Sequence, residues 1–156
     1  MSCPICDWTP EPPNYLFIHE SDHWRAVLAP NQCLLGRCVI HLKRHCGNLA
    51  ELTEAELLDW LPFVREHQHA VQSAFGARMF NWSVYMNHAY RDASPSPHIH
   101  WWAVPRYDHE VIFANLVFDD PQFGDPYDHV RWREVPEGIH QKIAEALREN
   151  FQAAPD

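Results

Sequence analysis

Two short motifs hold the side chains of this sequence that are best suited to chemistry, and the first is His98-Ile99-His100. In a strand over 98–104, successive side chains alternate between faces, so both imidazoles would share one face and Ile99 would lie on the other. Near neutral pH an imidazole can act as a nucleophile, a proton carrier or a metal ligand. Because the motif is short, a pair of partly exposed strand histidines without a function is the alternative.

The second motif is Cys3-Pro4-Ile5-Cys6, in which one tight turn can present two thiolates to a single Zn²⁺. A redox-active pair would be expected at the start of a helix that follows a strand, whereas the proline-rich residues 8–13 favour no helix. Incidental thiols are a third interpretation. The sequence has five cysteines, an odd number, which fits reduced thiols or a metal site better than a disulfide framework.

The elements that must position these motifs show strand and helix patterns in turn. Short runs rich in β-branched and aromatic residues, bounded by turn residues, predict strands. After three such runs the apolar spacing changes to that of a long helix, and two more strands follow. This order favours an α+β domain, with an antiparallel sheet of about five strands and a helix on one face. The expected strands span 15–20, 24–29, 36–42, 79–87 and 98–104.

The long helix has recognisable signals at both ends. Thr53 and Glu56 form a capping-box pattern at its start, and Gly76 offers a C-terminal stop. Pro62 lies inside the apolar pattern, so it should kink the helix or move its start later. The helix also carries histidines 67 and 69, which we interpret as surface or partly buried residues rather than ligands.

The length of 156 residues favours a single domain over 1–156. Its parts would be a zinc-knuckle N-terminus (1–14), a core (15–105) and a C-terminal extension (106–156). The extension contains turn signals and an irregular stretch, followed by a C-terminal helix over about 136–151 that a proline opens.

The charge and apolar patterning exclude several partners. A formal net charge of −9 argues against binding to a nucleic-acid backbone, which needs clustered basic residues, although a few converging cations would still hold a small anion. No apolar run approaches the length of a membrane span, and the N-terminus has no signal-peptide pattern. We therefore expect a cytoplasmic protein without a membrane or nucleic-acid partner.

The order and separation of the motifs resemble the histidine-triad (HIT) superfamily of nucleotide hydrolases and transferases. The resemblance covers most of the chain from Cys3 to about Tyr107. It rests on the stretch 36–45, on Asn87 eleven residues before the HxH pair, and on the Val-Pro-Arg that follows the pair. Zinc-binding members, among them the galactose-1-phosphate uridylyltransferase branch, hold one metal with a CxxC, a distant histidine and the first histidine of HxH. The resemblance therefore implies a Zn²⁺ site of Cys3, Cys6, His45 and His98.

The same resemblance makes His100 the nucleophile. Family chemistry is attack on the α-phosphorus of a nucleotide ester, anhydride or amidate, with a nucleotidyl-histidine that water or another acceptor resolves. Such covalent catalysis divides one difficult displacement into two easier ones. The phosphoryl oxygens also need hydrogen-bond donors. The candidates for substrate binding are Asn87, Arg37, Ser94, Ser96 and Trp102.

Two positions depart from the usual family pattern. Trp102 stands where the family has a third histidine and the transferase branch has glutamine, and an indole N–H can donate a hydrogen bond but cannot relay a proton. Arg37 stands where the typical hydrolase has histidine. The transferase branch has arginine at this position, as this chain does, and an arginine remains charged beside a phosphate. The chain thus resembles a zinc-containing, transferase-like variant in a single-domain frame.

Three classes of function follow from these residues. The first is a nucleotide hydrolase or nucleotidyltransferase that acts at the α-phosphorus of nucleoside phosphate derivatives, such as dinucleoside polyphosphates, through His100. The second is a nucleotide-binding module with little or no catalysis, because the third motif histidine is replaced. The third is a structural zinc domain.

The resemblance also implies a homodimer, which the sequence permits through 53–75 and 79–86. Substrate specificity is expected in 15–35 and 106–135.

Overall fold

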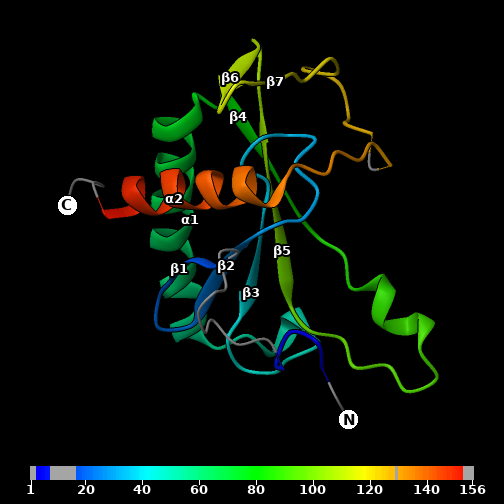
Figure 1. Cartoon of the computed structure of the whole chain (residues 1–156). Helices are drawn as coiled ribbons and strands as arrows, with labels where there is room; N and C mark the ends of the chain where they lie inside the picture. Colours follow the sequence, from blue (N-terminus) through cyan, green and yellow to red (C-terminus); the bar gives the residue numbers. More distant parts are fainter. Residues whose placement is uncertain (1–2, 8–16, 129, 153–156) are drawn as a thin grey trace.

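A computed structural model describes residues 3–7, 17–128 and 130–152 of the chain. A five-stranded sheet and two α-helices form the main body, and a short hairpin follows β5 (Figure 1). The strands are β1 (Phe17–Glu20), β2 (Trp24–Leu28), β3 (Cys38–Leu42), β4 (Met79–Val84), β5 (His100–Arg106), β6 (Val111–Phe113) and β7 (Leu116–Phe118). The helices are α1 (Glu54–Phe75) and α2 (Glu137–Gln152), with 3-10 turns at η1 (Leu49–Glu51) and η2 (Asn87–Arg91).

The main sheet is antiparallel throughout, with the strand order β1-β2-β3-β5-β4. Strand β5 therefore lies between β3 and β4, and β4 forms one edge. His100 is paired with His41 of β3, and Trp102 is paired with Val39 of β3 and Ser83 of β4. This architecture confirms the predicted α+β fold with a five-stranded antiparallel sheet, a long helix and a C-terminal helix.

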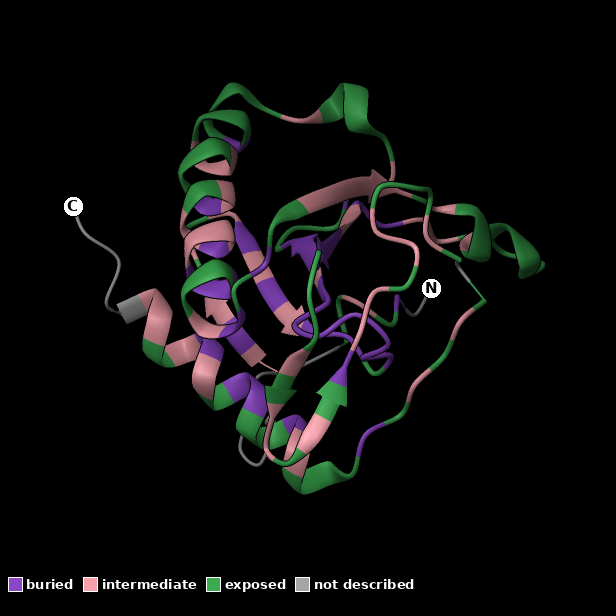
Figure 2. Cartoon of the chain, turned by 90° about the horizontal axis from the view of Figure 1, so that it is seen from above, coloured by how far each residue is buried: buried purple, intermediate pink, exposed green. Residues whose placement is uncertain are grey.

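The two faces of β5 have different surroundings. Trp101 faces α1, where it stacks on Trp60 with ring centroids 4.9 Å apart. Helix α2 crosses α1 on this side, and the buried residues of α1 face inward (Figures 1 and 2). On the other face, Trp102 packs with Val104 against a small cluster that includes Leu34. The large hydrophobic core thus lies between the sheet and the helices, and the opposite face of the sheet carries only a small cluster.

The ends of α1 follow the sequence signals. Thr53 Oγ1 accepts from the backbone N–H of Glu56, and the Glu56 carboxylate accepts in return from the N–H of Thr53, as a capping box requires. Gly76 ends the helix in the left-handed region at φ 74°, and its N–H donates to the carbonyl of Gln72. The helix runs through Pro62 from Glu54, so the alternative of a later start is wrong.

Three of the predicted strands have other boundaries in the structure. The strand expected over 36–42 begins at Cys38, because Gly36 has φ 79° and closes a loop instead. The strand expected over 79–87 ends at Val84, and the strand expected over 98–104 runs from His100 to Arg106. His98 therefore lies just before β5 rather than in it. The predicted C-terminal helix is confirmed to within a residue at each end, whereas the first part of the strand expected over 15–20 lies outside the described residues.

The segment 106–135 contains a hairpin that its pattern did not predict. Strands β6 and β7 pair antiparallel around Ala114 and Asn115, which both have positive φ, 49° and 64°. Two left-handed residues match the two-residue hairpin turns that fit strand twist, but such turns usually contain glycine. Each strand has only three residues, too few for an alternating pattern to be visible.

None of the helices in the described residues combines the length and apolar composition of a membrane span.

His67 on α1 is fully buried, so its interpretation as a surface or partly buried residue is wrong, although His69 is partly buried as expected. Its ring lies near Trp82 and Phe151, with centroids 5.8 Å from each. Within the described part of the chain, neither ring nitrogen has a hydrogen-bond partner. Burial lowers the pKa of His67 from 6.5 to about 3, because a charged imidazolium would lose its hydration there.

Replacing His67 by Leu is expected to reduce acid lability. The pKa of this histidine is 6.5 in the unfolded chain and about 3 in the folded protein, so the unfolded chain binds a proton at a higher pH. Burial of the neutral ring therefore costs no stability above pH 6.5, and the free energy of unfolding declines as the pH falls from 6.5 toward 3. Between pH 7 and 5 this loss amounts to about 2 kcal/mol. In urea denaturation, the free energy of unfolding of H67L should decline between pH 7 and pH 5 by about 2 kcal/mol less than that of the wild type. The matched variant His69→Leu, on the same helix, should decline like the wild type; equal decline in all three proteins would contradict the assignment.

Candidate active site and metal centre

His100 is held in one tautomer at the start of β5. Its Nδ1 lies 2.8 Å from the backbone carbonyl oxygen of His98, which can only accept a hydrogen bond. The proton therefore resides on Nδ1, and Nε2 carries a free lone pair. The side chain is only partly buried and lines a cavity, so a substrate can reach this nitrogen. A neutral imidazole with an accessible Nε2 is the form that a nucleophile requires.

The cavity has a volume of about 740 Å³, which suits a small molecule of nucleotide size. It lies on the sheet face opposite the helices, between β5, the η2 region and the N-terminal knuckle. The structure brings together here all six residues that were predicted to act on substrate. These are Arg37, Asn87, Ser94, Ser96, His100 and Trp102.

Arg37 is buried and stacks on the neighbouring aromatic ring. Its guanidinium carbon lies 4.4 Å from the centroid of the Trp102 ring, a cation–π contact. The residue is 7% exposed, and within the described residues its Nε has no hydrogen-bond partner. Because Arg37 lines the cavity, its guanidinium places a positive charge there for an anionic oxygen.

A glutamine that the sequence did not single out shapes the loop that carries Arg37. The buried Gln32 side chain donates to the carbonyls of Ala29 (2.7 Å) and Arg37 (3.0 Å) and accepts from the N–H of Gly36 (2.9 Å). Gly36 also packs closely on α1, because an added Cβ would come within 3.1 Å of Phe75. The loop is thus closed from inside and holds Arg37 at the cavity.

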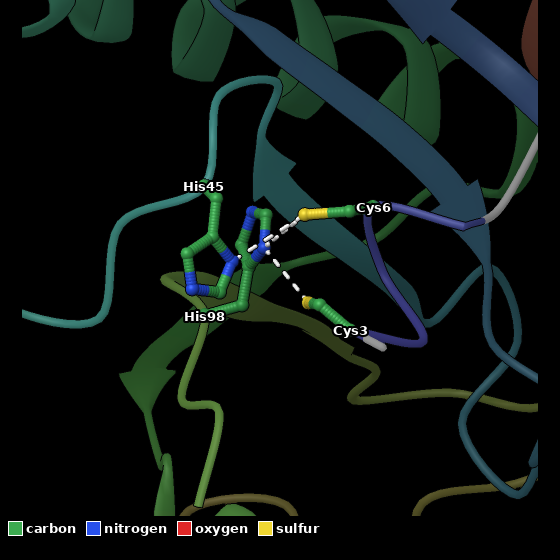
Figure 3. Close-up of side chains that lie close together, drawn as sticks. All are labelled: Cys3, Cys6, His45 and His98. Carbon is green, nitrogen blue, oxygen red and sulfur yellow. Dashed lines mark hydrogen bonds between the residues drawn. The ribbon is translucent and has the colours of Figure 1, made fainter. Parts of the chain in front are cut away.

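Four side chains converge at a second centre beside the cavity (Figure 3). One ligand atom from each of Cys3, Cys6, His45 and His98 lies within 4.8 Å of the others. His98 Nδ1 is 3.3 Å from Cys3 Sγ and 3.4 Å from Cys6 Sγ, and His45 Nδ1 is 3.4 Å from Cys6 Sγ. These are the four residues that the family resemblance assigned to a metal.

The donor set and spacing fit a tetrahedral metal ion. Zinc bonds of about 2.3 Å to sulfur and 2.0–2.1 Å to nitrogen place neighbouring ligand atoms about 3.6 Å apart, close to the three separations above. His98 Nε2 lies 2.7 Å from the carbonyl of Leu42, so this nitrogen carries the proton and Nδ1 is left for the metal. The side chains present therefore fit a metal ion bound by two cysteines and two histidines.

A close approach of two loops places His45 next to His98. An added Cβ on Gly47 would lie 2.7 Å from Pro97 Cγ and 2.9 Å from the Pro97 carbonyl oxygen, so only glycine fits. Beside this contact, the N–H of Ile99 donates to the carbonyl of Cys46 at 2.8 Å. Residues more than fifty positions apart in the sequence thereby become neighbours in the Cys-His cluster.

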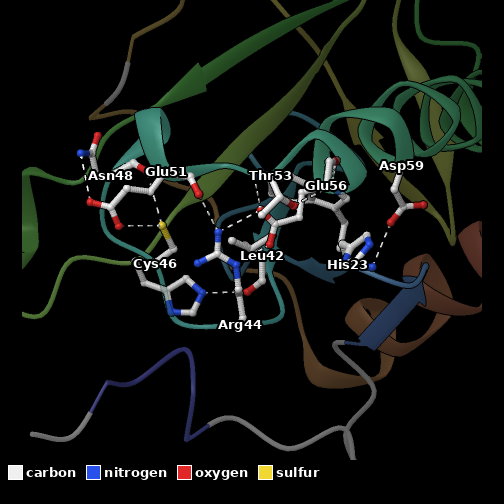
Figure 4. Close-up of polar contacts among 11 residues, drawn as sticks. His23, Leu42, Arg44, Cys46, Asn48, Glu51, Thr53, Glu56 and Asp59 are labelled. Atoms are coloured by element: carbon white, nitrogen blue, oxygen red, sulfur yellow. Dashed lines mark hydrogen bonds and ion pairs between the residues drawn. The ribbon is translucent and has the colours of Figure 1, made fainter.

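An ion pair anchors the loop that carries His45 to the start of α1 (Figure 4). Arg44 donates to the buried Glu56 carboxylate from Nη2 at 2.9 Å and also from Nε, and to the carbonyl of Glu51 at 2.8 Å. The hydrogen bond from Arg44 lowers the pKa of Glu56 from 4.5 to about 2. Glu56 thus serves both the helix cap and the loop.

Glu56→Gln is expected to lower the free energy of unfolding by about 1–3 kcal/mol at pH 7, because the variant loses charge-assisted hydrogen bonds at a buried site. The depressed pKa means that the wild-type contribution is present above pH 4.5 and lost as pH falls toward 2. Chemical denaturation at pH 7 and 3.5 should therefore show a smaller difference between wild type and variant at the lower pH. Glu54→Gln, an exposed position in the same turn, serves as the control and should match the wild type; equal stability of E56Q would contradict the anchor.

The cavity also contains residues that the sequence analysis missed. Tyr127 reaches it from the C-terminal extension and packs near Trp102. The buried Arg106 at the end of β5 holds that segment, since its guanidinium donates to the Asp120 carboxylate and to the carbonyls of Gln122 and Asp125. The remaining unpredicted lining residues are Pro4, Ile5, Tyr85, Met86, His88, Ala89 and Asp92.

His41 is a further unpredicted neighbour of His100. It lies opposite His100 in the sheet, and its ring meets that of His98 edge-on, with centroids 6.1 Å apart. Burial lowers the pKa of His41 to about 4, so the ring is neutral at pH 7 and adds no positive charge beside His100.

No family model and no curated protein matches this sequence. Solved structures do match its fold. A Zn-bound histidine triad family protein from Mycobacterium smegmatis is 16% identical over 88% of this chain and 84% of that one, with a TM-score of 0.58. A hypothetical histidine triad nucleotide-binding protein from Sulfolobus tokodaii strain 7 has the same identity and coverage and a TM-score of 0.62. A uridylyltransferase is 15% identical over 91% of this chain but 43% of its own, with a TM-score of 0.62.

These similarities establish that the chain has the histidine-triad fold, as the motif order implied, and that the fold is shared with a uridylyltransferase. At such low identity the comparison speaks for the fold, and the activity has to be argued from the site itself.

Proposed function

We propose that the protein is a zinc-containing nucleotide hydrolase or nucleotidyltransferase that acts at the α-phosphorus through a nucleotidyl-histidine at His100. The observation that carries the proposal is the hydrogen bond from His100 Nδ1 to the carbonyl of His98, which leaves Nε2 as a nucleophile at the cavity. Arg37 at the same cavity supplies a permanent positive charge for a phosphate.

The reaction proceeds in two displacements. His100 Nε2 attacks the α-phosphorus, the bond to the leaving group breaks, and the new imidazolium is stabilised by the His98 carbonyl that faces Nδ1–H. An incoming water or other acceptor then breaks the P–N bond and returns the electron pair to Nε2. Arg37, Asn87 and the hydroxyls of Ser94 and Ser96 are donors at the cavity wall for the phosphoryl oxygens.

The proposed zinc ligands are Cys3, Cys6, His45 and His98, and a bound ion would supply a cross-link between the knuckle, the loop after β3 and the approach to β5. Since the backbone carbonyl of His98 orients His100, fixing His98 also fixes the nucleophile. The knuckle residues Pro4 and Ile5 form part of the cavity wall, so the ordering of the knuckle contributes to the substrate site.

A nucleotide-binding module without turnover is the second candidate function. The observation that favours it is the position of Trp102, whose ring centroid lies 6.2 Å from that of His100. A proton carrier at this position would assist a leaving group, and an indole is not one. In this case the cavity would bind nucleotide and release it unchanged.

The stereochemistry of hydrolysis tests the proposal. A dinucleoside polyphosphate with a chiral α-phosphorothioate is incubated with the protein in ¹⁸O-labelled water, and the released nucleotide is analysed for configuration. Two displacements predict net retention. Inversion would contradict a covalent intermediate, and tight binding without any release would favour the binding module.

We further propose a homodimer in a reducing, cytoplasmic setting. Strand β4 lies at the edge of the sheet with most of its side chains partly exposed, and an edge strand offers unpaired backbone groups to a second copy. All five cysteines are free, and metal-binding thiolates need reducing surroundings. Sedimentation equilibrium of the purified chain tests the dimer, since a monomer mass at micromolar concentration would exclude it.

A further inference from the structure

The residue beside the nucleophile on β5 cannot supply a proton. Trp102 follows His100 by two positions on the same face of the sheet, and the two rings are nearly perpendicular at 75° with centroids 6.2 Å apart. Its indole N–H donates a hydrogen bond but does not ionise near neutral pH. The partners of Trp102 across the sheet are Val39 and Ser83, and neither is an acid near neutral pH.

The same place holds a permanent positive charge. Arg37 covers the face of the Trp102 ring at 4.4 Å and lines the same cavity. A guanidinium stays protonated in proteins, so it cannot act as an acid, but it stabilises an oxyanion through charge and paired N–H donors. This part of the cavity therefore favours a leaving group that departs as an anion.

One other imidazole could replace the missing acid. Among the described residues that line the cavity, His88 is the remaining histidine outside the metal cluster, and it lies on the exposed η2 turn rather than on the sheet. Its exposure places it at the rim of the cavity, next to solvent. The test below includes it as a rival source of a proton, and the wild-type series also detects a proton from the Tyr127 phenol, which packs near Trp102.

We propose that the site is specific for nucleoside 5′-phosphoric anhydrides, such as dinucleoside polyphosphates and nucleoside diphosphate sugars, and discriminates against amidates and alkyl esters. This inference rests on the proposed function and narrows its substrate class. The leaving group of an anhydride is a phosphate or phosphomonoester, which has a second pKa of about 6 and is stable as an anion at pH 7. The leaving group of an amidate is an amine and that of an alkyl ester is an alcohol, and each has to gain a proton as its bond to phosphorus breaks.

The step balances without an acid. The Nε2 lone pair of His100 forms the bond to the α-phosphorus, and the bond from phosphorus to the bridging oxygen breaks. The electron pair stays on that oxygen, which leaves as part of a phosphate anion beside Arg37. The Nδ1 proton remains hydrogen-bonded to the His98 carbonyl. In the second step water adds to phosphorus, its proton passes to solvent, and the P–N bond returns its electrons to Nε2.

The experiment is a single-turnover measurement of nucleotidyl-histidine formation with adenosine 5′-phosphate derivatives. Aryl esters with leaving groups of graded pKa, one dinucleoside polyphosphate and one alkyl phosphoramidate serve as substrates. The wild type should show a steep decline of rate with rising leaving-group pKa, and the anhydride should react at least about 100-fold faster than the amidate, since general acid catalysis typically contributes that much. A flat dependence with comparable anhydride and amidate rates would overturn the inference.

Three variants locate the cause. Trp102→His, which places a proton carrier there, should flatten the leaving-group dependence and narrow the ratio of anhydride to amidate rate about tenfold or more. Trp102→Phe keeps a ring under Arg37 without an acid and should retain the wild-type ratio even where both rates fall. His88→Gln should also retain the ratio, and a selective change in amidate rate there would assign the acid to His88 and overturn the role of Trp102.

The outcomes separate this inference from the proposed function. If labelled protein forms from anhydrides and amidates at similar rates, the nucleotidyl-histidine enzyme stands and the anhydride specificity is wrong. If no substrate in the series labels the protein, the covalent function itself is wrong, and the specificity inference is overturned with it. The wild-type series alone gives both readings, so the test does not depend on the folding of any variant.

Discussion

Replacement of His100 by Asn is expected to reduce the rate of nucleotide turnover at least about 1,000-fold, because removal of a covalent nucleophile leaves only the contribution of binding and charge stabilisation. Asparagine retains polar contacts at the start of β5 but has no nucleophilic nitrogen. The fold and most of the nucleotide affinity should remain, since Arg37 and Asn87 still line the cavity. The measurement pairs steady-state turnover with calorimetric titration of the same nucleotide.

The control for this substitution is His109→Asn, an exposed histidine that contacts Asp108 away from the cavity. It should leave both turnover and affinity at wild-type values. Turnover of H100N close to that of the wild type would remove His100 from the role of nucleophile. Loss of affinity in H100N equal to its loss of turnover would instead show that the residue acts in binding.

Cys6→Ser is expected to abolish binding of the proposed zinc ion and to lower thermal stability. Serine is a poor zinc ligand at neutral pH, and a site with three ligands binds more weakly. With zinc at 100 times its dissociation constant, the wild type gains about 2.7 kcal/mol from the bound ion. For a chain of this size that gain corresponds to about 5–10 °C in Tm. Zinc content by atomic spectroscopy and Tm, each with and without chelator, provide the test.

Cys46→Ser is the matched control. Cys46 follows His45 in the same loop, yet its sulfur faces the carbonyl of Asn48 rather than the cluster. The C46S variant should keep one zinc per chain and should respond to chelator like the wild type, whereas C6S should be insensitive to it. A C6S protein with full zinc content and an unchanged Tm would show that the knuckle interpretation is wrong.

The local parts of the fold were accessible from the sequence because their signals are local. The capping box of Thr53 and Glu56 and the stop at Gly76 need only neighbours along the chain, and both occur as expected. The Cys-His cluster was reached differently. No spacing rule links Cys3 to His45 or His98, so the set came from the family resemblance, and the structure brings these residues within ligand distance.

Other parts of the site depend on contacts that no local pattern reveals. Tyr127 enters the cavity because Arg106 binds a loop that lies 14 to 19 residues further along the chain. The closure of the Arg37 loop depends on hydrogen bonds made by Gln32, a residue type that is common on surfaces. His67 looked like a surface residue because burial of an unpaired imidazole is unfavourable, and only the packing of α1 against β4 and α2 shows that it occurs.

The most direct test of the central claim is the covalent intermediate itself. Purified protein is mixed with a dinucleoside polyphosphate labelled at the α-phosphorus and quenched within one turnover, and the protein is examined for label that is labile in acid and stable in base, as a phosphorus–nitrogen bond to histidine is. The account predicts label on the wild type that maps to His100 and is lacking in His100→Asn. Nucleotide release with no labelled protein at any quench time, or equal label in the variant, would contradict it.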